Sequence, residues 1–263
     1  RTKFEPMTDL FLNDQCVLKD LQLVLLDKDG TIVDIHHYWG SMLKERAQIT
    51  VNRWFADSKI KKEIHDELID AMGFDLVNKR MKPGGPVGVK PRTFIVKVAR
   101  EVVCRNGVSI VEEEIEKLFK IVDRQTETNI LPSLKVLPGV NTFIKKCYKL
   151  GVQIGVVTTD ITQRGIKALQ ALGIDHCFQY VVGSDQVKNH KPASDSVDII
   201  LEKSGLSRDK TVVIGDHVVD VEMGIKSAVG CNIGVLTGLG SQESFTPFSC
   251  HLIGSFKELS LLR

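Results

Sequence analysis

Hydrophobic residues fall into short blocks along the chain, and the block at residues 21–26 is almost unbroken, with Gln22 as its exception. The block is too short for a typical helix, and a continuous apolar run of this length is typical of a strand buried on both faces of a parallel sheet. Two carboxylates, Asp27 and Asp29, follow it directly and precede Gly30. The pattern therefore predicts a buried strand with acidic side chains at its carboxyl end.

A helical pattern occupies the chain from about residue 36 to residue 128. Apolar residues recur there at the spacing of one helix face. Helices are expected near 38–56, 60–76, 92–104 and 111–122. The densest Pro/Gly stretch of the chain, residues 82–91, separates the two pairs and cannot be regular structure. We expect a four-helix insertion folded as two hairpins.

Strands and helices alternate after residue 137. Strands are expected at 152–157, 180–182, 211–214, 232–236 and 251–253. The helices between them end at glycine, the residue type expected just past a helix C-terminus. This alternation predicts a parallel sheet with helices on both faces. The predicted fold class is α/β, with a doubly wound, Rossmann-like parallel sheet core and an inserted all-helical cap domain.

The insertion sets the expected domain boundaries. Residues 21–34 and 136–263 are predicted to form the α/β core, and residues 35–135 the helical cap. Residues 1–20 carry little pattern and are interpreted as an N-terminal extension with no assigned function. An insertion that directly follows the first strand is well placed to act as a lid over the carboxyl ends of the strands.

Composition and charge narrow the class of protein. The 263 residues are 43% hydrophobic and 26% charged, as expected of an ordinary globular protein. The formal net charge of +2 is too small to indicate nucleic acid or a membrane surface as a partner, and no apolar run approaches the roughly 20 residues that span a bilayer. The N-terminus lacks the apolar core of a signal peptide, and the scattered cysteines favour free thiols in a reducing compartment. We expect a cytoplasmic protein, as a monomer or a homodimer.

Residues suited to phosphate chemistry lie near the ends of four predicted strands. They are Asp27 and Asp29, Thr158 and Thr159, Lys191, and Asp216 and Asp220. Parallel strands of a doubly wound sheet end at one edge, where ligands bind, so these side chains should lie together. Two acids as close as Asp27 and Asp29 repel each other unless a cation lies between them or they share a proton. Oxygen-rich sites of this kind suit magnesium.

Each of these groups also has a purely structural explanation. Asp-Gly is common turn chemistry, Thr158 or Asp160 could cap the following helix, and a lone Lys191 is usually solvated. Asp216 could be a helix N-cap, with Asp220 interacting favourably with the helix dipole in the first turn. Their joint occurrence at one sheet edge is the argument for a functional site.

The motifs resemble those of the haloacid dehalogenase-like superfamily. Its four motifs have counterparts here in the same order: Asp27-x-Asp29-Gly30-Thr31, Thr158, Lys191 and Gly215-Asp216-x-x-x-Asp220. The resemblance covers about residues 21–253. The helical insertion after the first motif is similar to that of the phosphoglycolate phosphatase and β-phosphoglucomutase branch.

The resemblance implies a magnesium-dependent phosphatase that hydrolyses a small phosphorylated metabolite through an aspartyl-phosphate. Asp27 would attack phosphorus, and Asp29 would protonate the leaving oxygen and then activate water. Mg²⁺ would be bound by the carboxylates of Asp27 and Asp216 and the backbone carbonyl of Asp29, with Asp220 in support. The phosphate would be held by Gly30, Thr158, Thr159 and Lys191.

Two positions depart from the usual pattern, and three other functions stay open. Lys28 stands where an apolar residue is common, either turned outward or adding positive charge at the cleft, and Thr159 stands where Asn is frequent. The alternatives are a sugar phosphomutase of the β-phosphoglucomutase type, a non-catalytic binding module, and a response-regulator-like phosphoacceptor. Retention of all four motifs speaks against the second, and Asp29 with the large insertion speaks against the third.

Overall fold

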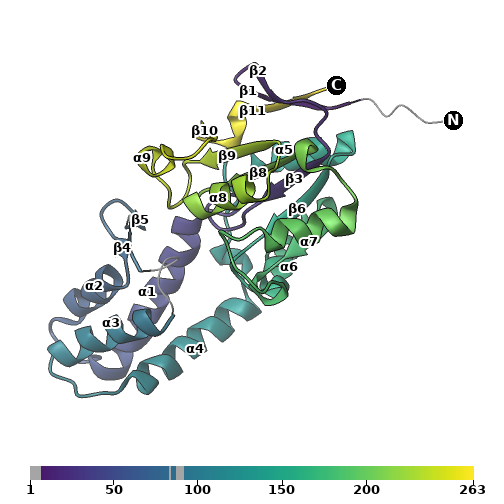
Figure 1. The fold of residues 1–263 in the computed structure, drawn as a ribbon. Coiled ribbons are helices and arrows are strands. Elements are labelled where there is room, and N and C mark those ends of the chain that lie inside the picture. The colour runs from purple at the N-terminus through teal and green to yellow at the C-terminus, as the bar shows by residue number, and fades with distance from the viewer. Residues whose placement is uncertain (1–6, 83, 87–91) are drawn as a thin grey trace. The chain divides into compact units, whose positions relative to one another are not determined.

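The computed structural model describes residues 7–82, 84–86 and 92–263, and the chain divides into two compact units (Figure 1). The α/β unit comprises Arg1–Asp34 and Val136–Arg263, and the helical unit comprises Ile35–Lys135. Among the helices of the described ranges, none is both long enough and apolar enough to cross a bilayer.

A six-stranded parallel sheet forms the centre of the α/β unit. Its strands are β3 (Leu23–Leu26), β6 (Gln153–Val157), β7 (Tyr180–Val182), β8 (Thr211–Gly215), β9 (Cys231–Val235) and β10 (His251–Ile253). Their order is β10-β9-β8-β3-β6-β7, and each neighbouring pair is parallel. All four residues of β3 are buried, because this strand lies between β8 and β6. The predicted doubly wound α/β fold is confirmed.

Helices and short 3-10 turns connect these strands. The helices are α5 (Val140–Leu150), α6 (Thr162–Ala171), α7 (Asp195–Ser204), α8 (Val218–Lys226) and the short α9 (Gln242–Phe245). The 3-10 turns are Asp175–Cys177, Ser184–Gln186, Arg208–Lys210 and Phe256–Glu258. Leu23 and Leu25 of β3 pack in one cluster with Val197 and Ile200 of α7 and Met223 of α8. Burying a side chain of this size stabilises the fold by about 1.5–3 kcal/mol relative to leaving it exposed.

The N-terminal segment forms strands that the sequence pattern did not predict. β1 (Asp9–Leu12) and β2 (Gln15–Leu18) form an antiparallel hairpin, and β1 also pairs with β11 (Leu259–Leu262). Figure 1 shows this small sheet close to the C-terminus. Asn13 and Asp14 both have positive φ, as a two-residue hairpin turn requires. Residues 9–18 are therefore part of the folded unit, and residues 1–6 lie outside the described ranges.

The helical unit contains α1 (Ile35–Trp54), α2 (Lys61–Ala71), α3 (Arg92–Arg105) and α4 (Glu112–Thr128), with a 3-10 turn at Leu131–Ser133. The helix expected at 60–76 is wrong at its C-terminal end. The chain leaves α2 at Gly73, whose φ of +97° is unfavourable for other residues, and forms the hairpin of β4 (Phe74–Asp75) and β5 (Arg80–Met81). Of the Pro/Gly stretch at 82–91, residues 83 and 87–91 lie outside the described ranges.

A partly buried cluster of charged residues joins three helices of this unit. Asp123 of α4 accepts hydrogen bonds from Arg46 of α1 at 2.8 Å and from Arg92 of α3 at 2.5 Å. Arg46 is only 4% exposed, and its guanidinium lies 4.9 Å from the ring centre of Phe119. Burial lowers the pKa of Arg46, while the hydrogen bond to Asp123 favours its charged form. Asp123 therefore compensates the positive charge of Arg46, which is buried away from water.

Replacing Asp123 with alanine is expected to lower the free energy of unfolding by about 2 kcal/mol, because the change leaves the buried Arg46 charge uncompensated, while the 24% exposure of Asp123 keeps the loss below that of a fully buried pair. The measurement is urea unfolding followed by circular dichroism. Asp66→Ala is the matched control in the same unit, since Asp66 pairs with Lys62 on the surface and such pairs contribute little. Equal losses in the two variants would contradict this prediction.

Candidate active site

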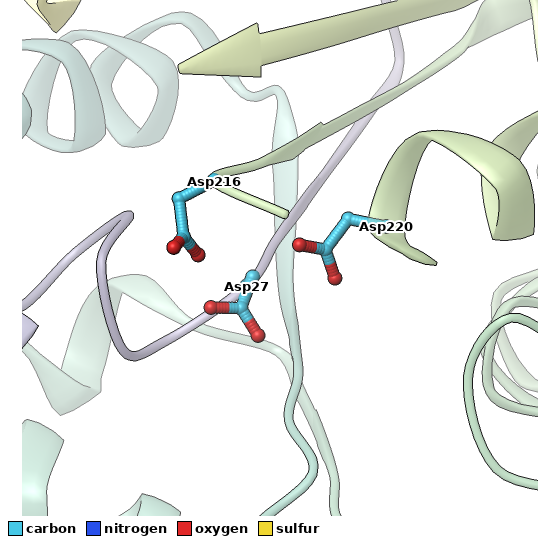
Figure 2. A group of neighbouring side chains, drawn as sticks. All are labelled: Asp27, Asp216 and Asp220. Atoms are coloured by element: carbon cyan, nitrogen blue, oxygen red, sulfur yellow. The ribbon is translucent and has the colours of Figure 1, made fainter. Parts of the chain in front are cut away.

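Three aspartates meet at the carboxyl edge of the central strands (Figure 2). Asp27 follows β3 and donates its N–H to the carbonyl of Ile214 at 3.0 Å. Asp216 follows β8, the strand paired with β3, and Asp220 lies in the first turn of α8. Oxygens of the three carboxylates lie within 4.8 Å of one another. The parallel register of β3 and β8 thus brings together residues that are far apart in the sequence.

Lys191 completes this cluster from the loop before α7. Its ammonium donates to Oδ1 of Asp27 and to Oδ1 of Asp220, both at 2.7 Å. The side chain is only 3% exposed, so the alternative of a solvated lysine is wrong. Within the described ranges, Oδ2 of Asp27 accepts no hydrogen bond. Lys191 therefore orients Asp27 and leaves one carboxylate oxygen without a bound donor.

The cluster holds more negative than positive charge. Burial raises the pKa of Asp27 to about 6, with Lys191 opposing the shift. Burial, followed by the charges of Asp27 and Asp220, raises the pKa of Asp216 well above its ordinary value. For Lys191, burial lowers the pKa, but the charges of Asp220 and Asp27 outweigh it and raise the pKa overall. Three carboxylates beside one ammonium form a hard-oxygen donor set whose charge fits a divalent cation such as Mg²⁺.

The loop after β9 contacts Asp216, and the predicted site did not include this loop. The N–H of Leu239 donates to Oδ2 of Asp216 at 2.8 Å, and the N–H of Gly240 donates to its backbone carbonyl at 2.8 Å. The signal was present as Gly238-Leu239-Gly240 after a predicted strand end. These contacts orient the Asp216 carboxylate independently of a helix cap.

The expected alternative of Asp216 as the N-cap of α8 is wrong. The N-cap residue of α8 is His217, whose side chain accepts from the N–H of Val219 at 3.4 Å. Asp220 accepts the N–H of His217 at 3.1 Å through its second oxygen, Oδ2. Asp220 therefore accepts one hydrogen bond at the N-terminus of α8 and one from Lys191, whereas Asp216 does not cap this helix.

Gly30 lies against Asp216, and its role differs from the one expected. Its N–H donates to the carbonyl of Val33 at 2.7 Å, so this donor is engaged inside the loop and does not face an anion. Its carbonyl accepts from the hydroxyl of Thr237 at 2.7 Å. Gly30 has a φ of +96°, and a Cβ atom there would lie 2.3 Å from Oδ2 of Asp216. Glycine is required here because the Asp216 carboxylate occupies the space that a side chain would need.

Gly238 offers a test of this packing, since a Cβ atom there would lie 1.9 Å from Oδ2 of Asp216. Gly238→Ala is expected to displace the carboxylate and, if the three carboxylates hold Mg²⁺ as their chemistry predicts, to weaken its binding about 10- to 100-fold, as changes beside metal ligands typically do. The measurement is titration calorimetry with Mg²⁺. Gly254→Ala is the matched control, because its methyl group would meet only the flexible Glu258 carboxylate, at 3.2 Å. Unchanged affinity in Gly238→Ala would contradict the prediction.

The threonines after β6 lie in different environments. Thr158 is buried, its N–H donates to the carbonyl of Val182 at 3.0 Å, and its hydroxyl oxygen accepts the N–H of Asp160 at 3.1 Å. Helix α6 begins at Thr162 with Ile161 as its N-cap residue, so Thr158 is not a helix cap. The Thr158 hydroxyl can still donate its proton, whereas Thr159 is exposed.

Asp29 is separate from the three-carboxylate cluster. Both of its carboxylate oxygens lie 2.6 Å from the ammonium of Lys28. Lys28 is 2% exposed, so the possibility that it turns outward is wrong and its charge is buried beside Asp29. The backbone carbonyl of Asp29 accepts no hydrogen bond from the backbone of the described residues. Its expected role as a metal ligand stays a prediction.

Two curated proteins resemble this chain over part of its length. The pyrophosphatase PpaX of Listeria monocytogenes serotype 4a (strain HCC23) is 30% identical over 110 residues, which are 42% of this chain and 50% of the relative. The phosphoglycolate phosphatase of Escherichia coli (strain K12) is 28% identical over 134 residues, 51% of this chain and 52% of the relative. The chain thus spans about half the length of these curated relatives.

A solved structure and a family match extend over more of the chain. A Thermotoga maritima protein assigned as a β-phosphoglucomutase has a TM-score of 0.66 at 18% identity, covering 90% of this chain and 96% of that protein. At this identity the likeness shows the fold alone. Residues 24–233 match the family described as haloacid dehalogenase-like hydrolase, which confirms the resemblance of the motifs. The chain belongs to the haloacid dehalogenase-like hydrolase family.

Proposed function

We propose that this protein is a magnesium-dependent phosphatase that hydrolyses a small phosphorylated metabolite. The observation that carries the proposal is Asp27 at the tip of the central strand, oriented by Lys191 at 2.7 Å and grouped with Asp216 and Asp220. The phosphatase names of the curated relatives support it, and so does the family. The six free cysteines support a reducing, cytoplasmic location. Monomer or homodimer stays a prediction.

The first step forms a bond between a carboxylate oxygen of Asp27 and phosphorus, while the bond from phosphorus to the ester oxygen breaks. Asp29 gives its proton to the departing oxygen, so that the alcohol leaves neutral. The product is an aspartyl-phosphate on Asp27. Lys191 keeps one oxygen of Asp27 engaged, which directs the other toward the substrate.

The second step returns the enzyme to its starting state. Asp29, now a carboxylate, takes a proton from a water molecule, whose oxygen attacks phosphorus. The bond between phosphorus and the Asp27 oxygen breaks, and inorganic phosphate leaves. The same residue thus acts as acid and then as base, which requires its carboxylate to stay in place through both steps.

Asp27 and Asp216 would hold the magnesium ion through their carboxylates and Asp29 through its carbonyl, with Asp220 in support. When bound, Mg²⁺ would supply positive charge to the phosphate oxygens. Thr158 can donate its hydroxyl proton to a phosphate oxygen. An ammonium has three donors, so Lys191 has one left for the phosphate beyond its bonds to Asp27 and Asp220. Thr159 is exposed, and its assignment to substrate binding stays a prediction.

The helical unit would act as the cap that closes over the substrate and excludes water from the first step. Its place in the sequence supports this role, since it is inserted after the strand that carries Asp27. Substrate choice would then depend on side chains of the helical unit.

The test is release of inorganic phosphate from p-nitrophenyl phosphate and from a panel of small phosphorylated metabolites, with Mg²⁺ present. Release is the expected result. Conversion of a sugar phosphate into its isomer, without phosphate release, would favour the phosphomutase alternative. Neither release nor isomer formation from any compound would overturn the proposal.

A further inference from the structure

We infer that Lys28 is a positioning residue that holds the Asp29 carboxylate for its acid and base steps. This inference rests on the proposed function, because it concerns the residue assigned there to proton transfer. It assigns a role to the position at which the chain departs from the usual apolar residue of the first motif.

The turn after β3 places the two side chains together. The N–H groups of Ile32 and Val33 both donate to the carbonyl of Lys28, each at 2.9 Å. Neighbouring side chains of a strand point to opposite faces, but this turn ends the strand geometry. The Lys28 ammonium therefore reaches both oxygens of the adjacent Asp29 carboxylate, at 2.6 Å. Contact with both oxygens restricts rotation of the carboxylate as well as its position.

A second carboxylate holds Lys28 from the neighbouring strand end. Oδ2 of Asp160, which follows β6, lies 3.7 Å from the Lys28 ammonium. Oδ1 of Asp160 accepts from the N–H of Ile161 at 2.8 Å and from Arg164 at 2.9 Å. Asp160 is thus fixed by its own loop and by α6. Lys28 is held from both sides, so it can act as a rigid support for Asp29.

Burial explains why this support depends on a positive charge. The side chain is 2% exposed, while Asp29 and Asp160 are 18% and 14% exposed. A buried ammonium is stable only when it is paired, and Asp29 and Asp160 both contribute to the pairing of Lys28. An apolar residue would fill the space but would leave Asp29 free to change rotamer. A misplacement of about 1 Å in a reacting group can lower a rate about 100-fold.

The contacts of Lys28 and Asp160 extend to Thr158, which is the proposed phosphate contact. The N–H of Asp160 donates to the hydroxyl oxygen of Thr158 at 3.1 Å. Lys28 therefore links the acid and base residue after β3 to the loop after β6 that presents Thr158. We expect its loss to act on proton transfer to the leaving oxygen, since the Lys28 ammonium contacts both carboxylate oxygens of Asp29 at 2.6 Å.

The test compares two esters that share a ring, phenyl phosphate and p-nitrophenyl phosphate. Phenolate is the poorer leaving group and depends more on a proton from Asp29. Lys28→Met is expected to lower kcat/KM for phenyl phosphate about tenfold or more, and that for p-nitrophenyl phosphate at most about threefold. Lys28→Arg should restore most of the loss, and Lys149→Met, on the exposed end of α5, should change neither value. Equal losses on both esters would overturn the inference.

Unfolding by urea gives a second test of the inference, one that does not depend on enzyme turnover. Urea unfolding of wild type, Lys28→Met, Asp29→Asn and the double variant forms a double-mutant cycle. Non-additive shifts of the unfolding midpoint are expected, because each residue compensates the charge of the other. Additive shifts would overturn the inference even if Lys28→Met lowered activity. If the wild type released no phosphate from any ester, the proposed function would fail, and the cycle alone would decide whether Lys28 holds Asp29.

Discussion

Replacing Asp27 with asparagine is expected to lower kcat for phosphate release at least about 10⁴-fold, the scale of loss when a nucleophile is removed. The amide has nearly the size of the carboxylate but is a poor nucleophile toward phosphorus. Phosphate release from the best substrate of the panel, with Mg²⁺ present, is the measurement. Activity within tenfold of the wild type would contradict the assignment of Asp27.

The Asp27→Asn variant should remain folded, and this separates lost chemistry from lost structure. The substitution removes one of three like charges at the sheet edge, while Lys191 keeps its bond to Asp220. The free energy of unfolding should therefore not decrease. Asp57→Asn is the matched control, because Asp57 is exposed in the helical unit and has no part in the proposed site. It should retain full activity.

Removing Mg²⁺ with EDTA is expected to lower phosphate release about 100- to 1,000-fold, and added Mg²⁺ should restore it. A metal supplies several kcal/mol of charge stabilisation, and each 1.36 kcal/mol corresponds to a factor of ten. The structural reason is the excess of carboxylates over ammonium groups at the site. Full activity in excess EDTA would contradict the magnesium assignment.

Unfolding provides a second readout of the metal that does not depend on turnover. A ligand at 100 times its Kd stabilises the native state by about 2.7 kcal/mol. Mg²⁺ should therefore raise the unfolding temperature of the wild type. Asp216→Asn should lose most of this shift, since Asp216 is 2% exposed and is held by Leu239 as a proposed ligand. Asp209→Asn, an exposed control in the same unit, should keep it.

The central strand and its partners were predictable because burial leaves a strong local signal. The apolar run before Asp27 became β3, and the alternating elements after residue 137 became the rest of the parallel sheet. The gathering of Asp27, Asp216 and Asp220 followed from topology alone, since parallel strands end at one edge. The same reasoning also placed Asp29 in this group, and there it was wrong, because the turn after β3 pairs Asp29 with Lys28 instead.

Features that depend on pairing across long sequence distances were not predictable in this way. Strand β1 pairs with β11 at the opposite end of the chain, and neither short strand has a strong pattern of its own. The hydrogen bond from Leu239 to Asp216 uses a backbone N–H, so the flanking glycines indicate a turn in the sequence but do not indicate its partner. The inward direction of Lys28 depends on the turn after β3 and on Asp160, so composition could not choose between its two orientations.

The central place of β3 has a consequence for the nascent chain on the ribosome. Both hydrogen-bonding partners of β3 follow the helical unit in the sequence: β6 at Gln153–Val157 and β8 at Thr211–Gly215. Until Asp216 and Asp220 have been synthesised, the nascent chain contains only one carboxylate of the cluster. Non-local pairing of this kind forms late. The proposed metal site and the proposed attack on a phosphate ester therefore require that translation has passed Asp220.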